Sequence, residues 1–127
     1  MALTYYEEGD VITVTVATGG ATAGALAEMT DDMTARDNTT VSSPTVIGVW
    51  ATTATAGNKA AIITRGVVSV TAGSSGMTAG KTVVVDDAAG AAGQKVEDGS
   101  GAGTVIGRAL DTVAANSTGK ILLGVGI

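Results

Sequence analysis

The chain has 127 residues, a length that favours one domain. Its net charge is −5 and its seven basic residues are scattered, which argues against nucleic-acid binding, because that binding depends on Lys and Arg neutralising phosphates. It contains no Cys and no His, which excludes disulfides, thiol nucleophiles, His general bases and most zinc sites. No apolar run reaches membrane-spanning length and Met1–Glu8 does not resemble a signal peptide, so we expect a cytoplasmic origin and no membrane partner.

The composition is poor in large core-filling side chains. There are 19 Gly, one Trp, two Tyr and no Phe, so the core must consist mainly of Val, Ile, Leu and Ala. A core without large aromatic side chains gains less stability from burial, and such a chain is a candidate for help from oligomerisation or from docking on a partner.

Short β-branched segments separated by glycine-rich turns dominate the chain. We interpret residues 1–10 as an N-terminal arm and residues 11–127 as a single β domain. The predicted strands, in chain order, cover residues 11–16, 45–50, 60–64, 67–71, 82–85, 104–110 and 120–123. The polar segment Glu28–Ser43 is the exception, and we expect a short helix or a long loop there. The predicted fold class is therefore all-β, a small compact barrel or sandwich with at most one short helix.

An internal repeat is the most informative feature of the sequence. Thr45–Gly48 recurs without change as Thr104–Gly107, an offset of 59 residues. Two further blocks match at an offset of 56 residues: 11–15 with 67–71, and 20–24 with 76–80. The order of the blocks is the same in both halves, which favours a duplication with pseudo-repeats at about 11–66 and 67–127. We expect two similar β units, each too small to bury its apolar face alone, to close on one another in one barrel-like domain.

The segment Gly80-Lys81-Thr82 ends like a phosphate-binding loop. That motif requires a second glycine five residues before Gly80, but Ser75 occupies this position. It also requires a helix after the threonine. The residues that follow, Val83–Asp86, are typical of a strand instead. We therefore interpret the glycine as part of a tight turn, and we expect no nucleotide or other cofactor.

Carboxylates occur in adjacent pairs, which raises acid–base catalysis and cation binding as possibilities. Adjacent residues of a strand point to opposite faces, so such pairs do not converge on one site unless a turn intervenes. The pairs are Glu7-Glu8, Asp31-Asp32, Asp86-Asp87 and Glu97-Asp98, and we interpret them as solvated turn residues. Without His no Ser-His-Asp triad can form, so we expect no enzyme activity and no metal site.

The few aromatic residues are the candidate interface residues. Tyr5 and Tyr6 lie on the N-terminal arm, which has little core of its own to join. Trp50 ends a predicted strand, where a core position is the first interpretation and an interface position the second, since Trp is enriched at interface hot spots.

Several blocks together resemble the capsid cement (decoration) proteins of tailed phages. The resemblance begins with Glu8-Gly9-Asp10, the Thr/Val strand and the glycines that follow it. It continues, in order, through Thr64–Val68, Thr78–Asp86, Thr104–Leu110 and Gly119–Leu123, and so covers nearly the whole chain.

The resemblance implies a structural virion protein that binds the outer surface of an icosahedral capsid and stabilises it. The implied partners are the major capsid protein and further copies of the chain, with a trimer favoured, and the implied location is the capsid exterior after synthesis in the host cytoplasm. The alternatives are another minor virion component, such as a head fibre or tail protein, and a carbohydrate-binding adhesin module. The adhesin is disfavoured because sugar sites usually need exposed aromatic platforms, and the chain has three aromatic residues in total.

Overall fold

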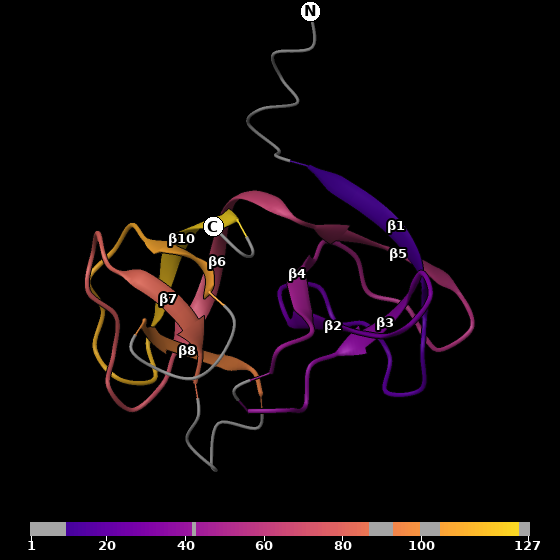
Figure 1. Cartoon of the computed structure of the whole chain (residues 1–127), viewed down its shortest axis with the longest axis horizontal. Helices are drawn as coiled ribbons and strands as arrows, with labels where there is room; N and C mark the ends of the chain where they lie inside the picture. The colour runs from indigo at the N-terminus through magenta and orange to yellow at the C-terminus, as the bar shows by residue number, and fades with distance from the viewer. Residues whose placement is uncertain (1–9, 42, 87–92, 100–104, 125–127) are drawn as a thin grey trace, which may run out of the picture.

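The structure is a computed structural model that describes residues 10–41, 43–86, 93–99 and 105–124. These residues form ten β-strands and no helix (Figure 1), so the all-β class predicted from the sequence is confirmed. No helix capable of crossing a membrane occurs in the described part of the chain.

The first five strands close into a barrel of their own. Its spatial order is β1-β3-β2-β4-β5, in which β1 and β3 run parallel and the other neighbours are antiparallel. The strands are β1 (Val11–Val16), β2 (Leu26–Asp31), β3 (Thr34–Asp37), β4 (Val46–Trp50) and β5 (Lys59–Ile63).

The second five strands repeat the same connectivity. Their order is β10-β6-β8-β7-β9, with β6 and β8 as the parallel pair. The strands are β6 (Arg65–Ala72), β7 (Thr82–Val85), β8 (Lys95–Asp98), β9 (Val105–Ala109) and β10 (Thr118–Gly124). We expected the two units to share one barrel, but each closes its own because its first strand pairs with both its third and its fifth. That residues 11–127 behave as a single domain stays a prediction.

The repeated Thr-Val-Ile-Gly block has a packing explanation. Its glycines, Gly48 in β4 and Gly107 in β9, each lie against the carbonyl oxygen of a residue in the neighbouring last strand, Ile63 and Leu122 respectively. An added Cβ would collide with that backbone oxygen in both barrels. The same close approach of two strands is therefore built twice, and only glycine fits it.

Strand alternation separates a core face from a solvent face. In β6, Val68 and Val70 point inward, whereas Arg65, Val67 and Ser69 point outward. The β-branched segment predicted as a strand from the sequence therefore alternates between the two faces. Each barrel is filled largely by small aliphatic residues, as the composition required, with Trp50 as the largest buried side chain.

The segment Glu28–Ser43 is neither a helix nor a long loop. Residues 28–31 and 34–37 belong to the antiparallel pair β2 and β3, which is joined by a turn at Met33, where φ is +47°. Glu28 is only 4% exposed, and its Oε1 accepts a hydrogen bond from Arg36 Nε across the two strands at 2.9 Å. This cross-strand ion pair stabilises charged residues within a sheet. The polar composition of the segment did not predict strands there.

The two barrels share an apolar contact. Leu26, Val46 and Val49 of the first barrel belong to the same cluster of buried residues as the core of the second, and Ile63 packs against it. The side chain of Gln94 spans the contact: its Oε1 accepts from Leu26 N at 2.8 Å and its Nε2 donates to Asn38 O at 2.6 Å. One outer face of the first barrel is thus covered by the second barrel.

Candidate functional site

The aromatic residues singled out from the sequence do not gather in the described structure. Tyr5 and Tyr6 lie outside the described residues. The Trp50 side chain is 1% exposed and packs in the core of the first barrel, and its indole N–H has no hydrogen-bond partner among the described residues. An interface role for these three residues stays a prediction.

An aliphatic patch stands on the outer face of the second barrel. Val67 in β6 and Leu122 in β10 are direct cross-strand partners, and they are 54% and 45% exposed. Leu110, directly after β9, is 47% exposed, and its N–H bonds Lys120 O, which places it diagonally beside Leu122. We call Val67, Leu110 and Leu122 the aliphatic patch.

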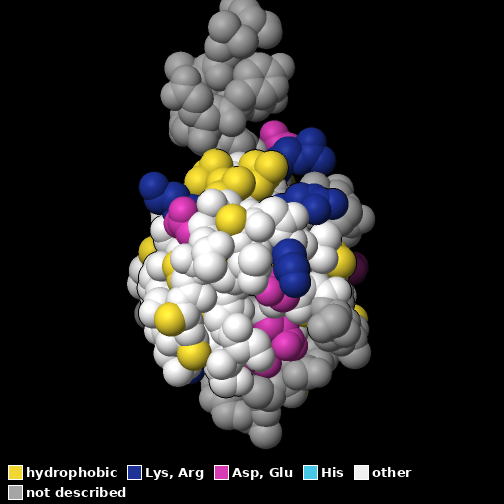
Figure 2. All heavy atoms as spheres, turned by 90° about the vertical axis from the view of Figure 1, so that its left-hand side faces the viewer, with side chains coloured by type: hydrophobic (Ala, Val, Ile, Leu, Met, Phe, Trp, Pro, Cys, Tyr) yellow, Lys and Arg dark blue, Asp and Glu magenta, His cyan; other side chains and the backbone are white. Residues whose placement is uncertain are grey.

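Basic side chains surround the aliphatic patch. Lys120 lies two residues before Leu122 on the same outward face of β10, and Arg108 in β9 is the cross-strand partner of Leu122. Arg65 lies two residues before Val67 on β6. All three are exposed, and Figure 2 shows hydrophobic side chains gathered in the upper part of this face with Lys and Arg side chains around them. We call the aliphatic patch together with Arg65, Arg108 and Lys120 the basic–aliphatic face.

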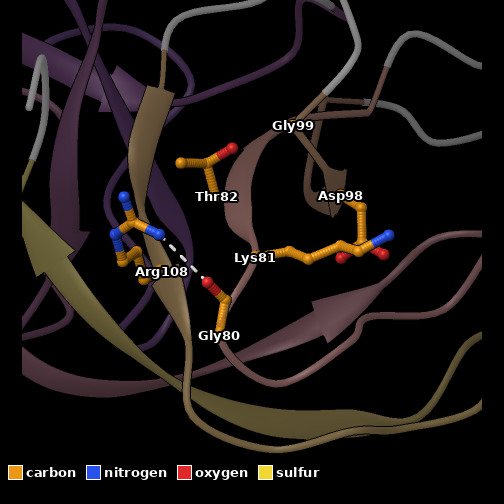
Figure 3. A pocket seen from close by; sticks show the side chains of 6 residues that line it. All are labelled: Gly80, Lys81, Thr82, Asp98, Gly99 and Arg108. Atoms are coloured by element: carbon orange, nitrogen blue, oxygen red, sulfur yellow. Dashed lines mark hydrogen bonds between the residues drawn. The ribbon is translucent and has the colours of Figure 1, made fainter.

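A hollow of about 450 Å³ adjoins this face at Arg108. Its lining residues are Gly80, Lys81, Thr82, Asp98, Gly99 and Arg108. Arg108 Nη1 donates to the carbonyl oxygen of Gly80 at 3.0 Å, while the Lys81 side chain extends along the opposite side toward Asp98 (Figure 3). The hollow therefore presents the guanidinium of Arg108 and the ammonium of Lys81, with the Asp98 carboxylate beside that ammonium (Figure 3).

The hollow is not a nucleotide site of the phosphate-loop type. Gly80 has a φ of +88° and lies in a tight turn, and Thr82 begins strand β7, so no helix N-terminus faces the hollow. The turn predicted for Gly80-Lys81-Thr82 is confirmed. Asp98 already serves the turn, because its Oδ1 accepts a hydrogen bond from Thr78 N at 3.0 Å.

Acidic residues do not form a chemical centre in the described part of the chain. No three metal-ligating side chains come together among these residues. Asp31 and Asp32 are exposed in the turn between β2 and β3, where Asp31 Oδ1 accepts the N–H of Asp32. Glu97 and Asp98 lie in strand β8, and Asp86 is 3% exposed, so the interpretation as solvated turn residues is wrong for these three. Glu7, Glu8 and Asp87 lie outside the described residues. The basic–aliphatic face and its hollow can recognise a surface, and they carry no arranged nucleophile and base.

Sequence reasoning missed this face because it looked for aromatic anchors. The signal was present in the strand period: Val67 alternates with buried valines and falls on the side of Arg65, while Leu122 falls on the side of Lys120. An aliphatic residue on the outward, mostly polar side of a strand is exposed to solvent. Two such residues on paired strands form an apolar patch.

Comparisons with known proteins give a family and a fold. A family model described as phage cement protein matches residues 6–125. Among solved structures, the chain is similar to the N base of the head fibre gp8.5 of bacteriophage phi29, with a TM-score of 0.60, 12% identity, and coverage of 91% of this chain and 93% of that chain. No curated protein sequence matches. At this identity the head-fibre structure shows that the fold is shared.

Proposed function

The chain belongs to the phage cement protein family, and we propose that it binds the outer surface of an icosahedral phage head and stabilises the assembled shell. The observation that carries the proposal is the family match over nearly the whole chain. The geometry supports it, because the described residues form two closed barrels with an exposed basic–aliphatic face and no arranged catalytic group. We accordingly propose a structural protein without enzyme activity.

The proposed mechanism is linkage between binding and assembly. A protein that binds the assembled shell better than free shell subunits stabilises the shell in proportion to that preference. Its partner is the major capsid protein, and it acts from the capsid exterior after synthesis in the host cytoplasm. A homo-oligomer, with a trimer favoured, would raise the strength of attachment because binding of one copy increases the effective concentration of the others at the surface.

A second candidate is a head-fibre base, which the shared fold with the phi29 head-fibre structure favours. In that role the same body would anchor a longer fibre to the head instead of clamping shell subunits. An adhesin module has less support, because the one tryptophan is buried and a sugar platform requires an exposed aromatic ring.

Cosedimentation with phage particles tests the proposal. The purified chain should pellet with expanded, mature-form shells, should not pellet with isolated tails, and should raise the temperature at which the shells open. Binding to tails alone, or no binding to any shell form, would refute the cement role. Tight binding that leaves the opening temperature unchanged would favour the fibre-base candidate.

The N-terminal arm is proposed to supply part of the contact through Tyr5 and Tyr6. Deleting residues 1–8 should weaken shell binding about tenfold or more while the thermal unfolding of the two barrels is unchanged, since aromatic side chains dominate many interfaces. Replacing only Glu7 and Glu8 by Gln serves as the control for the lost charge. Equal binding by the deleted and full chains would exclude the arm from the contact.

A further inference from the structure

The aliphatic patch of the second barrel is about half exposed, with Val67 at 54%, Leu110 at 47% and Leu122 at 45%. We propose that the basic–aliphatic face docks on a surface of the shell subunit that presents carboxylates beside an aliphatic centre. This inference rests on the proposed function and adds which face of the molecule meets the shell.

Part of the equivalent face of the first barrel, at Val49 and Ile63, is already used for packing. Val67 pairs with Leu122 as Val11 pairs with Ile63, and Leu122 pairs with Arg108 as Ile63 pairs with Val49. In the first barrel Val49 is 2% exposed and Ile63 is partly buried, because both pack against the second barrel. In the first barrel this part of the sheet face therefore packs against another part of the same chain. In the second barrel the equivalent part is exposed.

The open version differs from the covered one chiefly in charge. At the position of the buried Val49 the second barrel has Arg108, and at the position of Ala61 it has Lys120. The aliphatic pair is kept, as Val67 and Leu122. A surface that retains its apolar centre and gains a basic rim is suited to a partner that pairs carboxylates with that rim.

The charges on this face are only partly compensated within the chain. Arg65 Nε lies 3.9 Å from Asp10 Oδ2, with side chains 67% and 54% exposed, so this ion pair is weak and open to exchange. Asp111 accepts a hydrogen bond from the backbone N–H of Lys120. Two acids therefore stand beside three basic residues, in a protein whose net charge is −5.

The hollow offers a further contact for a carboxylate of the partner, beside the basic residues of the face. Arg108 lies both on the basic–aliphatic face and in the lining of the hollow, with Lys81 on the opposite wall. A guanidinium carries five N–H donors, and among the described residues the Arg108 guanidinium makes one hydrogen bond, from Nη1 to Gly80 O. A carboxylate side chain of the partner would enter between Arg108 and Lys81 while an aliphatic neighbour covers Leu122.

The first barrel offers a control variant for the test, because Val11 is the equivalent of Val67 and Lys59 lies two residues before Ala61, the equivalent of Lys120. V67T/K120E removes one methyl contact and reverses one charge on the proposed face. V11T/K59E makes the same chemical changes on the first barrel, where Val11 is 49% exposed and Lys59 is exposed in β5. The full-length proteins would be compared by cosedimentation with expanded shells, with thermal unfolding to check that both variants fold and with light scattering to follow their mass.

The proposal predicts that V67T/K120E weakens shell binding about 10- to 100-fold and that V11T/K59E changes it by less than about threefold. Binding of the wild type should also weaken between about 50 and 500 mM salt, because its charged rim is exposed to screening. R108Q alone should give an intermediate loss.

Three results would overturn the proposal. Equal binding by V67T/K120E and the wild type would exclude this face while leaving the cement function intact, and equal losses in both double variants would indicate a general effect of charge. A change of oligomeric mass in V67T/K120E without loss of shell binding would assign the face to contacts between copies of the chain. No binding by the wild type would refute the proposed function itself.

Discussion

The Gln94 side chain joins the two barrels, and its removal should destabilise the whole chain. Its Oε1 accepts the N–H of Leu26 at 2.8 Å, and its Nε2 donates to Leu26 O at 3.2 Å and to Asn38 O at 2.6 Å. Leu26 is 2% exposed and Asn38 is 1% exposed, so in a Gln94→Ala variant their backbone groups would have poor access to water. Three hydrogen bonds at about 0.5–1.5 kcal/mol each, partly replaced by water at the half-buried Gln94, give an expected loss of about 2–3 kcal/mol.

The assay is urea unfolding followed by the fluorescence of Trp50, which is the chain's single Trp and lies in the first barrel. Gln94→Ala should lower the midpoint, and its effect should not add to that of Asn38→Ala. The Asn38 side chain donates from Nδ2 to the carbonyl oxygen of Gly93, beside Gln94, so both variants weaken the same contact between the barrels. The control is Asn58→Ala, which removes an exposed hydrogen bond to Thr55 and should cost less than about 0.5 kcal/mol. Stability unchanged by Gln94→Ala, or strictly additive effects with Asn38→Ala, would refute this account of how the barrels are joined.

Two further predictions address the barrels themselves. Gly107→Ala should lower the free energy of unfolding by about 3 kcal/mol, because the added Cβ would meet the Leu122 carbonyl oxygen. Gly80→Ala should lower it by about 1–2 kcal/mol, because Gly80 has a φ of +88° but open space around it. Equal losses for the two variants in thermal unfolding would contradict the packing explanation. Arg36→Met should lower the free energy of unfolding by about 1–3 kcal/mol, because it leaves Glu28, whose side chain is 6% exposed, without its partner. The double variant E28M/R36M should recover most of that loss in urea unfolding. A double variant as unstable as Arg36→Met would contradict this explanation.

The sequence predicted the strands that are driven by β-branched residues. Val11–Val16 and Thr82–Val85 form strands with the predicted bounds, and the other five predicted strands agree within a few residues. The three strands that were not predicted are β2, β3 and β8, and all three carry charged residues. Their pairing depends on neighbours distant in sequence, such as the partners that β3 and β8 find in β1 and β6, and a local pattern carries no information about such partners.

The internal repeat predicted two similar units but not how each unit closes. Closure depends on the parallel pairing of β1 with β3, which joins Thr15 to Thr34 and Val16 to Ala35. The polar segment after Glu28 concealed the third strand, so a barrel of five strands in each half could not be counted from the sequence. The repeated glycine at 48 and 107, in contrast, marked a real structural requirement.

The candidate surface could not be predicted from residue types alone. An exposed valine or leucine has no signature until its strand partners are known, and Val67 becomes part of a patch only because β6 pairs with β10 at Leu122. Trp50 illustrates the converse, because the single tryptophan attracts an interface interpretation and yet is 1% exposed. Interface residues in a protein with few aromatics have to be identified from the pairing of strands.

The central claim is that this two-barrel chain works on the outside of a phage head. An electron-microscopy map of the phage particle that carries the chain tests it most directly. The account predicts density for two small barrels on the outer surface of the head, in contact with the major capsid protein through the second barrel. Density confined to the tail or to the interior of the head would contradict it.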